Sequence, residues 1–200
     1  MASKPITILI WLLKLVSRYK HKPVLYLAAF SLTSHSSYAL SAQQPDTERF
    51  ATLQAAYVFN IAKFFQWPVD ALSQHITLCL FGDDRLPLLQ QLKQGIQSRV
   101  LHQLPVQVHL LSSNSLHSAP VDCHILYLLQ APNPQQLQQL KQQYGNRVLK
   151  IAAPDVKGND LALIELALEQ NRLVLYLNAA ALSRSELKAS PSFLSVAKQR

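Results

Sequence analysis

The sequence predicts an α/β fold, a single three-layer domain in which helices flank a mainly parallel or mixed sheet. Two continuous apolar runs, His75–Phe81 and Cys123–Leu129, have the composition of strands that are buried on both faces, as in parallel sheets. Segments with helical periodicity alternate with such runs along the chain. The 200 residues, 49% of them apolar, suit one domain plus an extension.

The opening helix is expected to run from about Glu48 to Gln66. Apolar and aromatic side chains cover most of its circumference and leave one narrow stripe. The stripe consists of Thr52, Ala56, Asn60 and Lys63. A helix of this kind belongs in the core. Trp67-Pro68 should end it, because proline pushes its predecessor away from the helical region and cannot continue the hydrogen-bond ladder.

The other elements are expected in a simple order. Strands are expected at His75–Phe81, Val106–Leu111, Cys123–Leu129 and Arg147–Ile151, and a hairpin at Leu161–Leu168 and Leu173–Leu177. The first arm of the hairpin also fits a helix. Further helices are expected at Leu86–Leu92, Asn133–Tyr144, Asn178–Leu182 and Glu186–Ala197, the last one interrupted at Ser190-Pro191.

The leader has the features of an export signal. Arg18–Lys22 is a basic region, Val24–Leu32 is an apolar run too short to span a bilayer, and Ser37 and Ala39 fit cleavage after Ala39. A further apolar run, Ile6–Leu13, precedes the basic region, and two explanations of it stay open. It is a retained amphipathic anchor, or the start of the chain is misassigned. The expected division is residues 1–39 as signal peptide, 40–47 as polar lead-in and 48–200 as the domain.

Charge and motifs argue against nucleic-acid binding and catalysis. Of the net charge of +8, five basic residues and no acidic ones lie in residues 1–42, so the remainder is only weakly basic. The chain has no GxSxG motif, and its four glycines form no phosphate-binding loop. Asp83-Asp84 fits a turn after a strand better than an acid–base pair. The sequence therefore predicts a non-catalytic protein without a cofactor.

Histidine spacing gives no metal site. The histidines outside the leader show neither HxxxH nor HExxH spacing. His124 beside Cys123 would supply half of a site, but a hydrogen-bonded strand histidine is the simpler interpretation. We therefore expect no bound metal.

Cys79 and Cys123 are the only cysteines, and in an exported chain they are most simply one disulfide. There is no CxxC motif. Three interpretations stay open: a redox-responsive switch, a static structural bond, or two buried free thiols.

The polar stripe of the opening helix and the aromatic residues beside it form a candidate binding site. Aromatic anchors next to a polar edge make an interface or a shallow pocket. The alternative is that the aromatics fill the core and the stripe only meets solvent. Asn178, just after a strand, either caps the following helix or lines a site. The candidates for binding a partner or ligand are Tyr57, Asn60, Lys63, Phe64, Trp67 and Asn178.

Several segments also resemble one known family. The opening stretch follows the pattern A-A-Y-x-x-N-x-A-K-[FY]-x-x-W-P at Ala55, Ala56, Tyr57, Asn60, Ala62, Lys63, Phe64, Trp67 and Pro68. Later matches are LCLFGDD (Leu78–Asp84), CHILYL (Cys123–Leu128), LKIAAPD (Leu149–Asp155) and NRLVLYLNAAALSRSEL (Asn171–Leu187). In these segments and their order, the chain resembles the YfiR-like family. It departs from the family pattern at Gly158–Asp160, Val174 and Tyr176 and lacks a second cysteine pair.

The resemblance implies a periplasmic regulator that holds an inner-membrane diguanylate cyclase inactive, so that cyclic-di-GMP stays low. The implied partners are this cyclase-type sensor protein, an outer-membrane lipoprotein and a second copy of the chain. The resemblance also implies two ways in which the cyclase is released from repression. One is a redox change at Cys79 and Cys123, which match family cysteines, and the other is capture of the regulator by an envelope partner. The alternatives are a small-ligand-binding protein serving a transporter or sensor kinase, and a thiol enzyme of the envelope.

Overall fold

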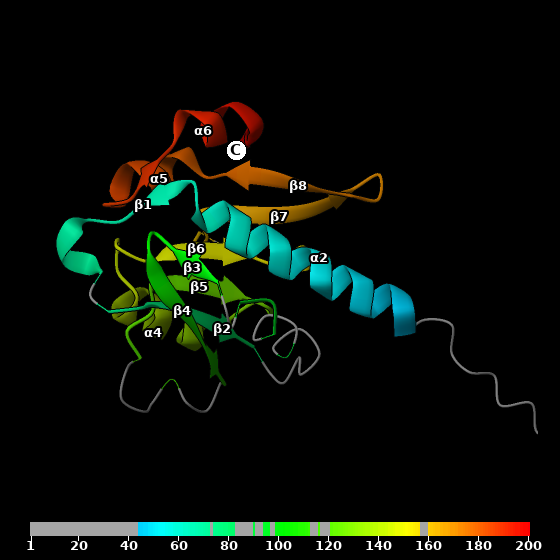
Figure 1. Ribbon diagram of the computed structural model, residues 1–200, viewed down its shortest axis with the longest axis horizontal. Helices are drawn as coiled ribbons and strands as arrows, with labels where there is room; N and C mark the ends of the chain where they lie inside the picture. The colour runs from blue at the N-terminus through cyan, green and yellow to red at the C-terminus, as the bar shows by residue number, and fades with distance from the viewer. Residues whose placement is uncertain are drawn as a thin grey trace, which may run out of the picture. The chain divides into compact units, whose positions relative to one another are not determined.

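Eight strands form one sheet in the part of the chain that the computed structural model describes (Figure 1). The described residues are 44–72, 74–82, 90, 94–96, 99–112, 116, 121–156 and 160–200. In spatial order the strands are β10 (Lys198–Gln199), β8 (Arg172–Leu177), β7 (Ile164–Glu169), β6 (Leu149–Ala152), β5 (Ile125–Leu128), β2 (Ile76–Phe81), β4 (Leu104–Leu111) and β3 (Val100–Leu101).

The centre of the sheet is parallel, as the sequence predicted. From β4 through β2, β5 and β6 to β7, each successive pair of strands is parallel, with Leu78 opposite Ile125 and Tyr127 opposite Ile151. Every residue of β2, β5 and β6 is buried, which explains their continuous apolar composition.

The predicted C-terminal hairpin is also present and makes the sheet mixed. β7 and β8 pair antiparallel, and β3 pairs antiparallel with β4 at the other edge. Gln170 and Asn171 join β7 to β8, both with positive φ (46° and 63°). Two successive residues of this kind form the tight turn whose twist matches a hairpin. The hairpin is therefore confirmed, and the alternative of a helix for its first arm, Leu161–Leu168, is wrong.

The opening helix, α2 (Gln44–Ala62), differs from the prediction at both ends. It begins within the expected polar lead-in and ends well before Trp67, and Phe65–Gln66 forms a strand, β1. β1 pairs antiparallel with β9 (Lys188–Ala189). Phe65 is fully buried there, so tertiary pairing and burial override the local preference for continuing the helix.

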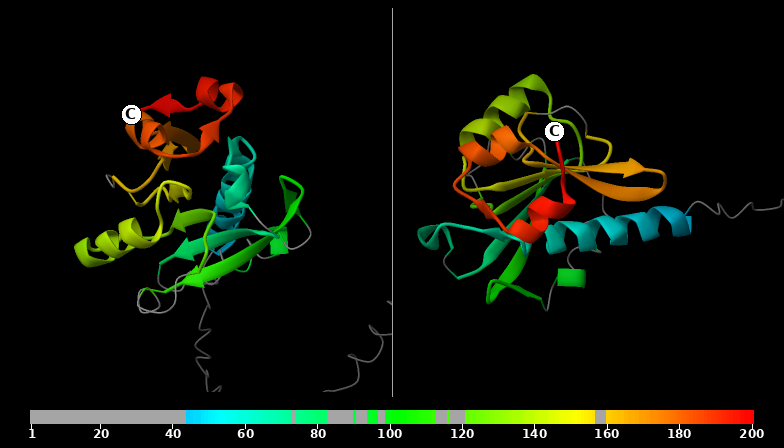
Figure 2. Two further views of the ribbon diagram at one scale, coloured as in Figure 1. Left: turned by 90° about the vertical axis from the view of Figure 1, so that its left-hand side faces the viewer. Right: turned by 90° about the horizontal axis from the view of Figure 1, so that it is seen from above.

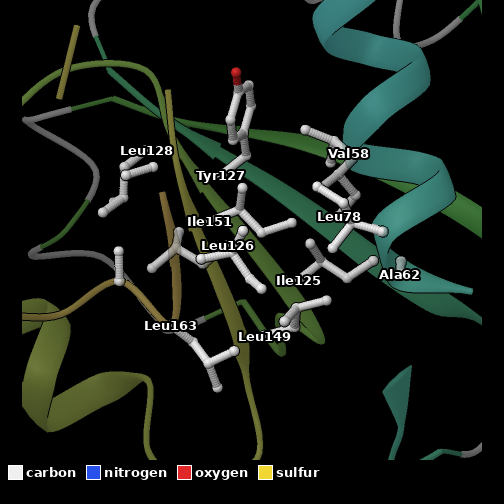
Figure 3. Close-up of a cluster of buried hydrophobic side chains, with 14 of the residues drawn as sticks. Val58, Ala62, Leu78, Ile125, Leu126, Tyr127, Leu128, Leu149, Ile151 and Leu163 are labelled. Carbon is white, nitrogen blue, oxygen red and sulfur yellow. The ribbon is translucent and has the colours of Figure 1, made fainter. Parts of the chain in front are cut away.

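Part of the core lies between α2 and one face of the sheet. Val58 of α2 lies beside Leu78 of β2 and Ile125 of β5, and all three are buried (Figure 3). The hydroxyl of Tyr127 on β5 donates a hydrogen bond to Gln54 of α2 at 2.5 Å. The same helix therefore contributes both apolar packing and a polar contact to one face of the sheet.

Three further α-helices are held by side-chain caps. α4 (Pro134–Gln143) begins with a capping box formed by Asn133 and Gln136, as its amphipathic pattern led us to expect. α5 (Ala179–Arg184) and α6 (Pro191–Val196) are both short. The expected helix Glu186–Ala197 was wrong in its first part, because Lys188–Ala189 forms the strand β9; the expected break at Ser190-Pro191 is where α6 begins. Ser190 caps α6 and proline occupies its first turn, where a missing N–H costs nothing.

Some predictions lie outside the described residues. The expected signal peptide at residues 1–39, the turn at Asp83-Asp84 and the expected helix Leu86–Leu92, apart from Gln90, belong to this group. The three-layer arrangement stays a prediction.

A short 3-10 turn, η1 (Val69–Ala71), lies between β1 and β2 along the chain.

Candidate functional site

A disulfide joins Cys79 in β2 to Cys123 just before β5, with their Cα atoms 5.7 Å apart. Both side chains are buried among apolar residues. β2 and β5 are neighbouring strands, so the bond crosslinks the centre of the sheet. Of the interpretations left open by the sequence, two free thiols do not fit this arrangement. A static bond and a redox switch both do.

His124, next to the disulfide, is fully hydrogen-bonded rather than half of a metal site. Its Nδ1 accepts a bond from the Thr77 backbone N–H at 3.0 Å, so Nε2 carries the proton and donates to the Ala71 carbonyl at 3.0 Å. Burial lowers the pKa of His124, which favours this neutral form. Within the described ranges, no three His, Cys, Asp or Glu side chains come together as metal ligands.

Trp67 lies in the core, although the sequence made it a binding candidate. The residue is 8% exposed, and its indole Nε1–H donates to the His124 carbonyl at 3.3 Å. His102 packs edge-on against the indole, with ring centroids 5.7 Å apart. Trp67 therefore connects the segment after α2 to the disulfide region, and any effect on binding would be indirect.

The other candidates of the opening helix lie at its C-terminal end. Asn60 and Lys63 are exposed, and Lys63 Nζ donates to Asn60 Oδ1 at 3.0 Å while lying 4.7 Å from the Phe59 ring centre. Phe64 is 39% exposed, and Tyr57 is half-buried. The polar stripe predicted from the sequence is thus exposed, and its end carries one accessible aromatic ring.

Helix α6 extends this exposed region. The Phe64 carbonyl accepts a hydrogen bond from Ser190 N–H, and the Phe64 ring lies 6.0 Å from that of buried Phe193. Both views of Figure 2 place α6 beside the end of α2. Leu194 and Val196 of α6 are also exposed. We call the exposed side chains of Asn60, Lys63, Phe64, Leu194 and Val196 the terminal surface.

Comparison with protein families decides the assignment of the chain. Residues 51–198 match a family described as YfiR/HmsC-like. The chain belongs to this family. No match was found among curated protein sequences. Membership suggests a regulatory role in diguanylate cyclase signalling in the periplasm. The family match runs from α2 to β10, so it includes both parts of the terminal surface.

Asn178 of this YfiR/HmsC-like protein has a structural contact. Its side chain accepts a hydrogen bond from Ala181 N–H at 2.9 Å and so caps α5. The capping interpretation is therefore confirmed, and a role in binding stays a prediction. None of the described helices has the length and apolar composition needed to cross a membrane.

An ion-pair network near the disulfide was not anticipated. The guanidinium of Arg147 donates to Asp70 at 2.7 Å and to Glu186 at 2.8 Å. The hydrogen bond from Arg147 holds the pKa of Asp70 below its usual value. The three groups are largely exposed, so the network contributes little to stability. They lie far apart in the sequence, and no local pattern marks such a network.

Proposed function

We propose that this YfiR/HmsC-like protein is a periplasmic, non-catalytic regulator that binds the periplasmic part of an inner-membrane diguanylate cyclase and represses it. The family match over residues 51–198 carries this proposal. The expected signal peptide at residues 1–39, with cleavage after Ala39, agrees with a periplasmic location. An outer-membrane lipoprotein and a second copy of the chain are further partners that the family resemblance implies.

Repression of this kind follows from a population shift. The cyclase exchanges between active and inactive states, and the regulator lowers its output only by binding the inactive state more tightly. Equal affinity for both states would shift nothing, however strong the binding. The regulator therefore needs a recognition surface and no catalytic group.

The terminal surface is the region that we infer to contact the cyclase. The backbone of Phe64 is held by its hydrogen bond to Ser190, and its aromatic ring packs near the ring of Phe193. Lys63 is likewise positioned by Asn60. Pre-positioned aromatic and basic side chains lose little conformational entropy on binding and are common energetic centres of interfaces.

The test is cyclic-di-GMP in the native host. Deleting the gene should raise cyclic-di-GMP, and the wild-type gene should restore the lower level. Phe64→Asp should fail to restore it, because loss of a central aromatic contact weakens binding by about 30-fold.

The matched control is Val69→Asp, which places the same charge at a residue that is 97% exposed and outside the terminal surface. It should restore repression fully. Unchanged cyclic-di-GMP after deletion would contradict the proposed function. Repression by Phe64→Asp equal to wild type would contradict the assigned surface alone.

A further inference from the structure

A cavity of about 340 Å³ lies where the end of α4, the start of β6 and α5 meet. It is separate from the terminal surface, sharing none of its residues. Its size is in the range of small-molecule sites, which are typically about 300–1,000 Å³. The cavity is lined on one side by Lys150 of β6, and this residue determines its chemistry.

Lys150 is the one charged side chain that is buried among the described residues, at 9% exposure. Its ammonium donates to the Gly145 carbonyl and, more weakly at 3.5 Å, to the Val148 carbonyl. An ammonium has three N–H donors, so one remains beyond these two contacts. No carboxylate of the described residues forms an ion pair with Lys150. A buried cation without a counter-ion is costly, and a bound anion would offset that cost.

The rim of the cavity adds further positive charge. Lys141 of α4 and Arg184 of α5 line it together with Lys150, and Asp160 is its only acidic residue among the described ones. Three cationic side chains against one carboxylate give the cavity a positive potential. Anions are therefore favoured over neutral or cationic ligands.

The remaining walls indicate what kind of anion fits. Leu161, Leu163 and Ala181 give the cavity an apolar portion. The Gly145 carbonyl and the C-terminal end of α4 bring partial negative charge toward the Lys150 ammonium. This partial charge disfavours a dianion such as phosphate more than a monoanion. A carboxylate attached to a short apolar group satisfies both features.

We propose that this cavity binds a small monoanionic carboxylate with an apolar group, whose carboxylate accepts a hydrogen bond from the Lys150 ammonium. The site goes beyond the proposed repressor function, and neither depends on the other.

The test is calorimetric titration of the purified protein with isovalerate, with its neutral amide isovaleramide, and with inorganic phosphate. Isovalerate should bind at one saturable site, and isovaleramide should bind about tenfold more weakly or not at all, because it lacks the charge. Lys150→Met should weaken isovalerate binding by about tenfold or more. The control Lys188→Met removes an exposed lysine of β9 outside the cavity and should leave binding unchanged.

A pH titration of the wild type keeps the test independent of how well the Lys150 variant folds. Burial lowers the pKa of Lys150 to about 8, so isovalerate binding should weaken as the pH rises through and above that value. Among the described residues, the other ionisable groups that line the cavity are Lys141, Tyr144, Asp160 and Arg184. Burial raises the pKa of Tyr144, so its hydroxyl stays neutral in this window.

Four results would overturn the proposal. They are the absence of saturable isovalerate binding, equal affinity for isovaleramide, wild-type affinity in folded Lys150→Met, and affinity that does not change with pH. Phosphate binding in place of isovalerate would overturn the assignment to a monoanionic carboxylate. None of these results would alter cyclic-di-GMP in the gene-deletion experiment, so failure of this proposal is distinguishable from failure of the proposed function.

Discussion

Replacing both disulfide cysteines, with Cys79→Ala and Cys123→Ala together, is expected to lower the free energy of unfolding by about 4 kcal/mol. The bond closes a loop of 44 residues in sequence separation, and its removal restores that conformational freedom to the unfolded chain. Alanine is the right replacement because both sites are buried and apolar, where a serine hydroxyl would need a hydrogen-bond partner. Urea unfolding without reductant measures the change.

The control is the same titration with reductant present. Reductant should destabilise the wild type by a similar amount and leave the double variant unaffected. Equal stability of wild type and variant without reductant would contradict a stabilising bond. If the folded double variant still represses cyclic-di-GMP as the wild type does, the bond is static. Loss of repression in the folded double variant would favour the redox switch.

Phe65→Ala is expected to cost about 3–5 kcal/mol of unfolding free energy, as for other large-to-small core replacements. Phe65 is fully buried in β1, opposite Ala189 of β9. Its ring packs edge-on against Phe193 of α6, with centroids 5.1 Å apart. The substitution removes the packing that holds the end of α2 to the C-terminal segment, and chemical denaturation reports the loss.

The neighbouring residue supplies a matched control. Phe64→Ala makes the same chemical change at a ring that is 39% exposed, so it should cost clearly less than Phe65→Ala. Similar losses for the two variants would contradict the assignment of Phe65 to the core and Phe64 to the surface. The pair also separates stability from partner binding, because only Phe64 belongs to the terminal surface.

Strands were predictable where the local pattern alone determines them. β2 and β5 are short apolar runs with flanking turns, and burial on both faces explains that composition. β4 alternates between partly buried and exposed residues, as its sequence does. The end of α2 was not predictable, because Phe65 pairs with Ala189, far along the chain. No local signal distinguishes a helical Phe65 from one in a two-residue strand.

The candidate site was predictable only in part, for a similar reason. The exposure of Asn60 and Lys63 follows from helical periodicity. The burial of Trp67 does not, since it depends on the carbonyl of His124 in a distant segment. Lys150 is an ordinary charged residue in the sequence and becomes distinctive only when α4, β6 and α5 enclose it.

The most direct test of the central claim is in-cell crosslinking of the tagged protein in its native host, followed by mass spectrometry of what it captures. We expect wild type and Val69→Asp to capture an inner-membrane protein with a cytoplasmic diguanylate cyclase domain. Phe64→Asp should lose it. Capture of no inner-membrane signalling protein by the wild type, or of a sensor kinase in place of a cyclase, would contradict the account.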